Sequence, residues 1–266
     1  MHLNPCSGYL GLVSILLSCC VLVAEAEAHE VWITTTQDGE GRLSVQVHHG
    51  HPGDRKTPDA DKVLELNAVD TDQKTISLLP GMTNTILDGM PVLLTRPISQ
   101  GGGRGIVLLT ARYDNGYWVK TSFGYRNTSK RQVADAEDSL YSMKFTKALV
   151  QMSSDASGLY RLVVGHRLEM VPLNDPFLLK PGESLSIQVY FDGKALPGSE
   201  IECGDGITPI KEQDIPRYRT DQQGIAVIPI TRRGPQLFVV DHVESSIHPD
   251  LAIRELYNST LSFVLP

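Results

Sequence analysis

The stretch Val45-Gln46-Val47-His48-His49-Gly50-His51-Pro52-Gly53-Asp54 joins an alternating apolar pattern to three of the chain's eight histidines. Apolar residues at every second position from Leu43 predict a strand with one face in the core. If this strand continues to His51, His49 and His51 share the core face and His48 lies on the other. Side chains two residues apart lie about 7 Å from each other, so both imidazoles could bind one metal ion if the backbone bends. The alternative is a solvated loop whose histidines have no role.

A preceding strand completes a predicted hairpin. Asp38-Gly39-Glu40-Gly41 is typical of a turn, and His29, Val31 and Ile33 fall on one face of the strand before it. A three-residue loop over residues 38–40 would place residue 29 opposite 49, 31 opposite 47 and 33 opposite 45, so that the apolar faces coincide. We therefore expect His29 to face His49, with their Cβ atoms about 5 Å apart.

Residues 1–28 have the pattern of a secretory signal peptide. An apolar run from Gly8 to Val23, too short for a comfortable transmembrane helix, precedes two overlapping Ala-x-Ala cleavage patterns in residues 24–28. Leu16-Leu17-Ser18-Cys19 faintly resembles a lipoprotein cleavage site, which makes lipid anchoring a minor alternative. Cleavage after Ala28 would make His29 the first residue, with an amine and an imidazole that can chelate nickel, copper or zinc. Cleavage after Ala26 would not.

Charge and cysteine content exclude several classes of protein. Loss of the leader changes the formal charge from −7 to −5, and an acidic surface argues against binding of nucleic acid or anionic lipid. Cys203 is the one cysteine outside the leader, so the secreted chain has no intramolecular disulfide. A lone thiol of this kind is more often a small buried hydrophobic group than a nucleophile.

The remaining pattern predicts an all-β protein of two domains. Residues 29–165 are expected to form an N-terminal, sandwich-like β domain, with a hairpin at Asp114-Asn115-Gly116 and a short helix or turn followed by a strand across 129–152. Gln100 to Gly105 is glycine-rich but lacks phosphate-loop spacing, which favours a flexible hairpin loop. About seven short strands over residues 166–266 predict an immunoglobulin-like sandwich.

Several motifs occur in an order that resembles a known family. They are Ala28-His29-Glu30-Val31-Trp32, Gly50-His51-Pro52, Val164-Gly165-His166-Arg167-Leu168-Glu169-Met170-Val171-Pro172, Leu179-Lys180-Pro181-Gly182-Glu183, Val189–Gly198 and Thr220–Gly224. The chain resembles a family of bacterial periplasmic proteins that carry a domain of unknown function and are often encoded near nickel or cobalt uptake systems. The resemblance implies a secreted β-rich protein that handles a transition metal.

The resemblance also implies which histidines bind the metal. It covers His29 and His51 directly, and it adds His242, which follows the apolar run 237–240. For His242 the alternative is an ordinary surface histidine at a strand end. We therefore predict metal ligands at His29, His49, His51 and His242.

Enzyme signatures are absent where the sequence allows a test. Ile33 occupies the second histidine position of an H-E-x-x-H motif, and no G-x-S-x-G motif occurs. We expect a non-enzymatic periplasmic protein that binds nickel or cobalt, with copper or zinc possible, and that passes the ion to a membrane transporter. Two alternatives stay open: a copper protein with a histidine brace, and an adhesion or scaffold sandwich without metal.

Overall fold

The structure is a computed structural model that describes residues 29–99, 105–155 and 157–266. The predicted signal peptide and the greater part of the predicted 100–105 loop lie outside these ranges. In the ranges described, no helix is long and apolar enough to cross a membrane.

Strands account for the regular structure of the described residues, together with short 3-10 helices. The strands up to residue 151 are β1 (Glu30–Gln37), β2 (Leu43–His51), β3 (Asp54–Lys56), β4 (Val63–Val69), β5 (Thr75–Ser77), β6 (Thr83–Leu87), β7 (Met90–Leu94), β8 (Ile106–Thr121), β9 (Gly124–Arg126) and β10 (Asp138–Gln151). Those that follow are β11 (Leu168–Pro172), β12 (Ser184–Phe191), β13 (Lys194–Ala195), β14 (Glu200–Gly204), β15 (Arg217–Arg219), β16 (Ile225–Pro229), β17 (Gly234–Ser245) and β18 (Arg254–Leu265). The 3-10 helices are η1 (Ala60–Lys62), η2 (Lys130–Gln132), η3 (Gly158–Arg161), η4 (Pro176–Leu178) and η5 (Glu212–Asp214).

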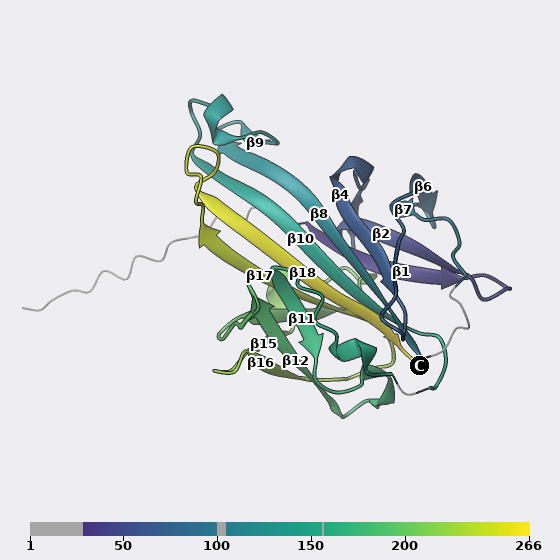
Figure 1. The fold of residues 1–266 in the computed structure, drawn as a ribbon. Helices are drawn as coiled ribbons and strands as arrows, with labels where there is room; N and C mark the ends of the chain where they lie inside the picture. Colours follow the sequence, from purple (N-terminus) through teal and green to yellow (C-terminus); the bar gives the residue numbers. More distant parts are fainter. Residues whose placement is uncertain (1–28, 100–104, 156) are drawn as a thin grey trace, which may run out of the picture.

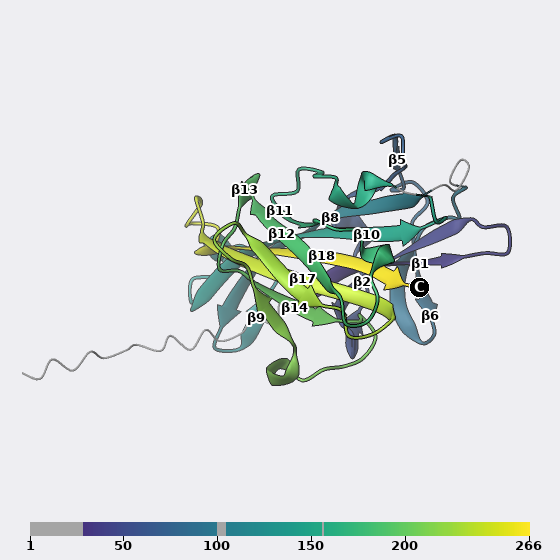
Figure 2. The same cartoon turned by 90° about the horizontal axis from the view of Figure 1, so that it is seen from below.

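These strands form three sheets. A five-stranded sheet has the order β1-β2-β7-β6, with β3 added to β2, and a four-stranded sheet is built on β12 from β11, β13 and β16. The largest sheet has nine strands in the order β15-β14-β17-β18-β10-β8-β4-β5, with β9 added to β8. Figure 2 shows β18 lying between β10 and β17. The prediction of an all-β sandwich protein is confirmed.

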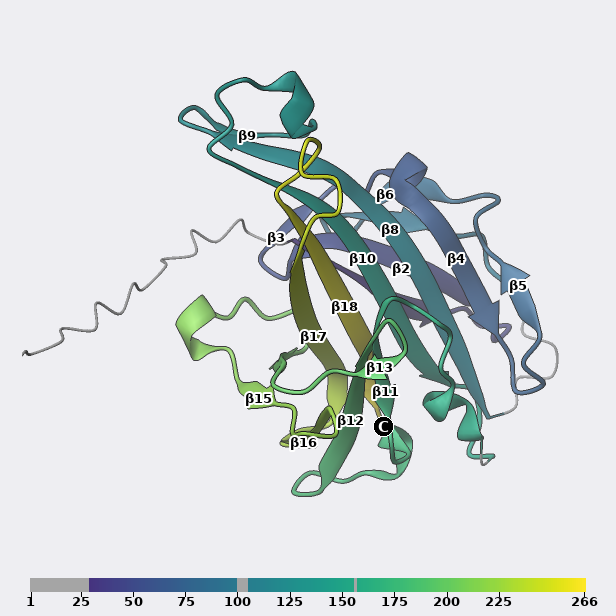
Figure 3. The same cartoon turned by 60° about the vertical axis from the view of Figure 1, so that its left-hand side comes forward.

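The nine-stranded sheet is the middle layer and carries a core on each face. Because side chains alternate along a strand, Val107 and Leu109 of β8 pack with Val31 of β1, whereas Leu108 packs in the other core with Leu168 of β11. In Figure 3, β11 and β12 accordingly lie on one side of the long strands and β2 on the other. The middle sheet therefore forms one sandwich with the sheet of β1 and β2 and a second sandwich with the sheet of β11 and β12.

The middle sheet crosses the predicted domain boundary at residue 165. β10 pairs in parallel with β18, and the two strands run side by side through the centre of Figure 1. The sheet therefore combines β4, β8 and β10 with β14, β15, β17 and β18. The division into two domains stays a prediction, and the hydrogen-bonded ladder is continuous across it.

The sequence prediction for residues 105–123 is wrong in one respect. Instead of a hairpin at Asp114-Asn115-Gly116, β8 runs unbroken from Ile106 to Thr121 and its register with β10 shifts at this point. Gly116 has a φ of +79° and donates its N–H to Oδ1 of Asp114 at 2.9 Å. A glycine with positive φ serves a β-bulge as well as a turn, which is why the motif misleads. The predicted turn and strand over 129–152 are confirmed as η2 and β10.

Candidate metal centre

The predicted hairpin exists, but its register differs from the prediction by two residues. β1 and β2 are antiparallel, with Val31 opposite His49 and Glu30 opposite Gly50. The turn is longer than three residues because the Asp38 carboxylate accepts hydrogen bonds from the backbone N–H groups of Glu40 and Arg42. A shift of two residues returns every side chain to its own face. The predicted distribution of the histidines over the two faces is therefore retained.

Three imidazoles meet at the end of this hairpin. The ring centroid of His29 lies 5.5 Å from that of His49 and 5.3 Å from that of His51. His49 also packs against the Tyr113 ring of β8, with centroids 5.3 Å apart. The prediction that His29, His49 and His51 come together is thus supported by the positions of the rings, with the His29 ring in contact with both of the others.

His49 is the innermost of the three rings. Both of its ring nitrogens are buried, and neither has a hydrogen-bond partner among the described residues. Burial, followed by the positive charge of Lys144, lowers the pKa of His49 to about 3. The imidazole is therefore neutral at physiological pH, which is the form that binds a metal ion.

Glu30 stands beside the outer ring. Nδ1 of His51 lies 2.8 Å from Oε2 of Glu30, an ion-pair distance. In metal sites a carboxylate commonly holds one nitrogen of a ligating histidine and so orients the ring. Glu30 is in position for that role toward His51.

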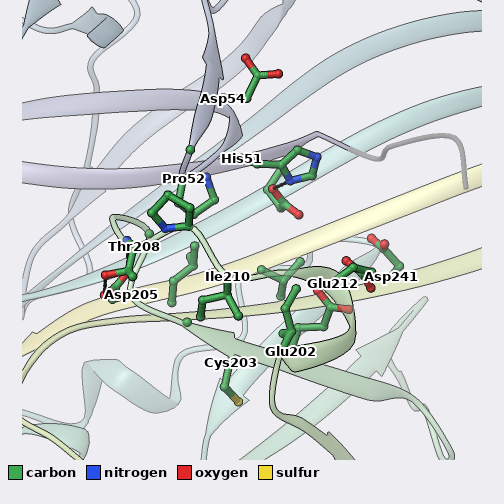
Figure 4. Close-up of a pocket in the computed structure, with 18 residues that line it drawn as sticks. His51, Pro52, Asp54, Glu202, Cys203, Asp205, Thr208, Ile210, Glu212 and Asp241 are labelled. Carbon is green, nitrogen blue, oxygen red and sulfur yellow. Dashed lines mark hydrogen bonds and ion pairs between the residues drawn. The ribbon is translucent and has the colours of Figure 1, made fainter. Parts of the chain in front are cut away.

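The open side of the cluster is an acidic cavity of about 500 Å³ between the β2–β3 turn and the β14–β15 connection. Figure 4 shows His51 and Asp241 on its walls together with Glu202 and Glu212. The carboxylates that line it are Glu30, Asp54, Glu202, Asp205, Glu212 and Asp241. Asp54 pairs with Lys56, Glu202 and Glu212 pair with Arg217, and Asp205 pairs with Arg232. Within the described residues the negative charge near His51 is therefore mainly that of Glu30 and Asp241.

Two lining groups have displaced pKa values. Desolvation by the surrounding walls raises the pKa of Asp241 to about 6, against the opposing effects of Asn258 and Lys144. The Asp241 side chain is nevertheless solvent accessible. Burial raises the pKa of the Cys203 thiol to about 12. This thiol is protonated at neutral pH, as expected for a small hydrophobic group.

Comparison with known proteins identifies the family. The model of a family described as a domain of unknown function, DUF4198, matches residues 26–244. The chain belongs to the DUF4198 family. The resemblance seen in the sequence is confirmed at this level, and the link to nickel or cobalt stays a prediction. No curated protein matches this DUF4198 chain.

Solved structures with some similarity to this DUF4198 chain include fragments of titin. Titin domains Z1Z2 in complex with telethonin show 14% identity over 89% of this chain and 93% of the other, with a TM-score of 0.17. The titin tandem A164-A165 shows 12% identity over 90% and 94%, with a TM-score of 0.16. TM-scores this low do not establish a common fold.

The other two histidines of interest in the DUF4198 chain lie apart from the cluster. His242 packs on Phe191 with ring centroids 4.2 Å apart and lies 3.7 Å from Glu244. It follows Asp241 in an unbroken strand, so it projects from the opposite face of the middle sheet. The structure thus does not bring His242 to the other three predicted ligands, because a strand end alone does not reveal which face a residue occupies.

His48 occupies the far face of β2, as predicted. Its ring stacks on Trp32 at 5.0 Å, and Nε2 lies 2.7 Å from Oγ1 of Thr34. Nδ1 lies 3.1 Å from Nη1 of Arg55. Both nitrogens are therefore occupied, and His48 is a structural residue of the DUF4198 chain.

Three polar residues of the site were missed from the sequence: Glu30, Lys144 and Asp241. Its place next to His29 in the sequence is the signal that could have pointed to Glu30, although the predicted register places it opposite His48 and only the observed one places it opposite Gly50. Lys144 and Asp241 carry no such signal. A lysine between apolar residues in a strand normally indicates a solvated face, whereas in the DUF4198 chain this face is covered by β1 and Lys144 is only 1% exposed.

Proposed function

We propose that this protein is a periplasmic transition-metal-binding protein whose ligands are the imidazoles of His29, His49 and His51. The observation that carries the proposal is the approach of these rings to within 5.3 to 5.5 Å. Imidazole nitrogens bind zinc at about 2.0–2.1 Å, so two rings on one ion have centroids about 5 Å apart. The measured separations are close to that value.

The site requires a small rearrangement to bind an ion. Among the described residues, no three His, Cys, Asp or Glu side chains already converge as a metal cage. His49 contributes a neutral ring whose nitrogens are buried and unpaired, and a metal ion would satisfy that donor set. Cleavage after Ala28 would add the α-amine of His29 as a further nitrogen ligand.

The acidic cavity supports uptake and release rather than permanent storage. It leaves the His51 side of the site open to exchange, and the carboxylates of Glu30 and Asp241 in its lining attract cations there. We propose that the protein passes its ion to a membrane transporter and catalyses no reaction. Nickel or cobalt is implied by the family resemblance, whereas nitrogen donors alone favour copper among divalent ions.

The test is a calorimetric titration with Ni²⁺, Co²⁺, Cu²⁺ and Zn²⁺. Protein that begins at His29 is compared with protein that carries one extra residue before it. Tight one-to-one binding is expected, weakened in the extended form if the α-amine is a ligand. A preference for Cu²⁺ alone would favour a copper brace over nickel or cobalt uptake. Absence of binding in both forms would refute the proposal.

Single variants locate the ligands. His51→Ala and His49→Ala should each weaken binding at least about tenfold, equivalent to about 1.4 kcal/mol. His242→Ala is the matched control, because His242 lies on the other face of the middle sheet and should leave the affinity unchanged. Unchanged affinity in His51→Ala, or a loss confined to His242→Ala, would exclude the proposed ligand set.

A further inference from the structure

Three polar residues form a row across neighbouring strands of the middle sheet. Lys144 of β10 lies directly opposite Asn258 of the parallel strand β18, and Asn258 lies opposite Asp241 of β17. Directly paired residues of adjacent strands project from the same face. The amine and the amide are therefore side by side beneath β1, and the carboxyl group follows them in the row at the edge of the cavity.

Two atoms of this row are buried without a hydrogen-bond partner among the described residues. Lys144 is 1% exposed and Asn258 fully buried, yet Nζ of Lys144 and Oδ1 of Asn258 are unpaired. Nδ2 of Asn258 donates to Oδ1 of Asp241 at 2.7 Å. An unpaired buried ammonium is costly, and native proteins rarely tolerate one.

Lys147, three residues further along β10, is a second buried lysine and has the partners that Lys144 lacks within the described ranges. It projects from the opposite face, where its Nζ lies 2.8 Å from Oε1 of Glu169 and donates to the carbonyl oxygen of Leu162 at 2.8 Å. Lys144 has neither kind of partner in the described part of the chain. A covalent change at the Lys144 amine would explain why it lacks the partners that Lys147 has.

We propose that Lys144 and Asn258 form an intramolecular isopeptide bond between Nζ and Cγ, with Asp241 as the acid that transfers the protons. The bond joins two adjacent parallel strands and converts the unpaired amine into a neutral amide. It is a modification of the folded chain, and the argument for it does not rest on the metal-binding proposal.

The reaction balances without any additional reagent. The neutral amine of Lys144 attacks Cγ of Asn258 and gives a tetrahedral intermediate. Asp241 receives a proton from Nζ and delivers one to Nδ2, the nitrogen that its carboxylate already contacts. The bond between Cγ and Nδ2 then breaks, and ammonia leaves as the new amide forms.

The surroundings of Lys144 and Asp241 favour the roles proposed for them in this reaction. Burial lowers the pKa of Lys144, which favours the nucleophilic free amine. The raised pKa of Asp241, about 6, places this carboxyl group near the range in which it can both accept and donate a proton. Asp241 also lines the acidic cavity, which gives ammonia a route to solvent.

Mass spectrometry of the purified, folded protein tests the proposal. A proteolytic digest should contain one branched peptide that joins the Lys144 and Asn258 segments and is about 17 Da lighter than their sum, because ammonia is lost. Recovery of the two segments as separate peptides of full mass would overturn the proposal. The wild-type chain decides this point, so the result does not depend on the folding of any variant.

Variants identify the participants. Lys144→Arg and Asp241→Asn should each abolish the branched peptide, whereas the matched control Lys147→Arg, on the other face of β10, should retain it in full. If Asp241→Asn folds, as judged by circular dichroism, and still forms the branched peptide at the wild-type rate, Asp241 is not the acid. Loss of the branched peptide in Lys147→Arg would show that a disturbed fold is enough to prevent the bond. Its loss in Lys144→Arg and Asp241→Asn would then no longer identify these residues as participants.

Discussion

Replacement of Glu169 by alanine is expected to be among the most destabilising single changes in this protein. Glu169 and Lys147 are both 1% exposed, and they form an ion pair between β10 and β11, with Nζ and Oε1 2.8 Å apart. The Glu169 carboxylate also accepts the backbone N–H of Val164 at 2.8 Å and that of Gly165 at 3.0 Å. One side chain therefore satisfies a buried ammonium and two partly buried backbone N–H donors.

The magnitude follows from what Glu169→Ala leaves behind. Removing one member of a buried ion pair costs about 3–5 kcal/mol, because the other charge stays buried. Each backbone N–H that loses its acceptor costs about 1–3 kcal/mol, reduced where water enters the vacated space. We expect a loss of about 4–6 kcal/mol in the free energy of unfolding. At about 2–4 °C per kcal/mol for a chain of this size, the melting temperature should fall by roughly 10–20 °C.

Urea denaturation of Glu169→Ala and of the double variant Lys147→Met/Glu169→Ala measures the charge contribution separately. The double variant lacks the unpaired ammonium, so it should be more stable than Glu169→Ala by about 2 kcal/mol. Burial lowers the pKa of Lys147. The unfolded single variant then binds more protons than the folded one, so its stability should rise as the pH increases toward the ordinary lysine pKa of about 10.4.

Two results would refute this reasoning about the Lys147–Glu169 pair. One is a Glu169→Ala protein within 1 kcal/mol of wild type, roughly the cost of an average substitution. The other is a double variant no more stable than the single one, which would mean that the unpaired charge is not the source of the loss.

Two further predictions concern acid stability and the turn after β2. Burial lowers the pKa of His48 to about 3 and that of His166 to about 4, both below the usual 6.5, so the unfolded chain binds protons first and stability falls as the pH drops below 6.5. Each should contribute a loss of about 2 kcal/mol at pH 5, so a flat urea midpoint between pH 7 and 5 would contradict these pKa values. Gly50 has a φ of +112°, and an added Cβ would lie 2.5 Å from the backbone oxygen of Asp54. Gly50→Ala should therefore cost about 1–3 kcal/mol and weaken metal binding, whereas Gly39→Ala, which has open space, should do neither; equal stability of the two variants would argue against strain at Gly50.

Local alternation accounts for what could be predicted from the sequence. The period of two in β2 predicts that Val45 and Val47 are buried and that His49 and His51 share their face while His48 does not, and the structure agrees. The same reasoning identifies an all-β protein. These properties depend only on neighbours in the chain, so they can be read without knowing which strands pair.

Pairing between distant strands was decided only by the tertiary structure. A two-residue shift of β1 against β2 preserves both faces, so alternation could not distinguish the two registers. The motif at Gly116 serves a turn or a bulge equally well, and the long ladder between β8 and β10 selects the bulge. The parallel pairing of β10 with β18 has no local signature, yet it places Lys144 beside Asn258. Such pairings are selected because they bury both faces of the middle sheet together, a property of the whole chain rather than of any segment.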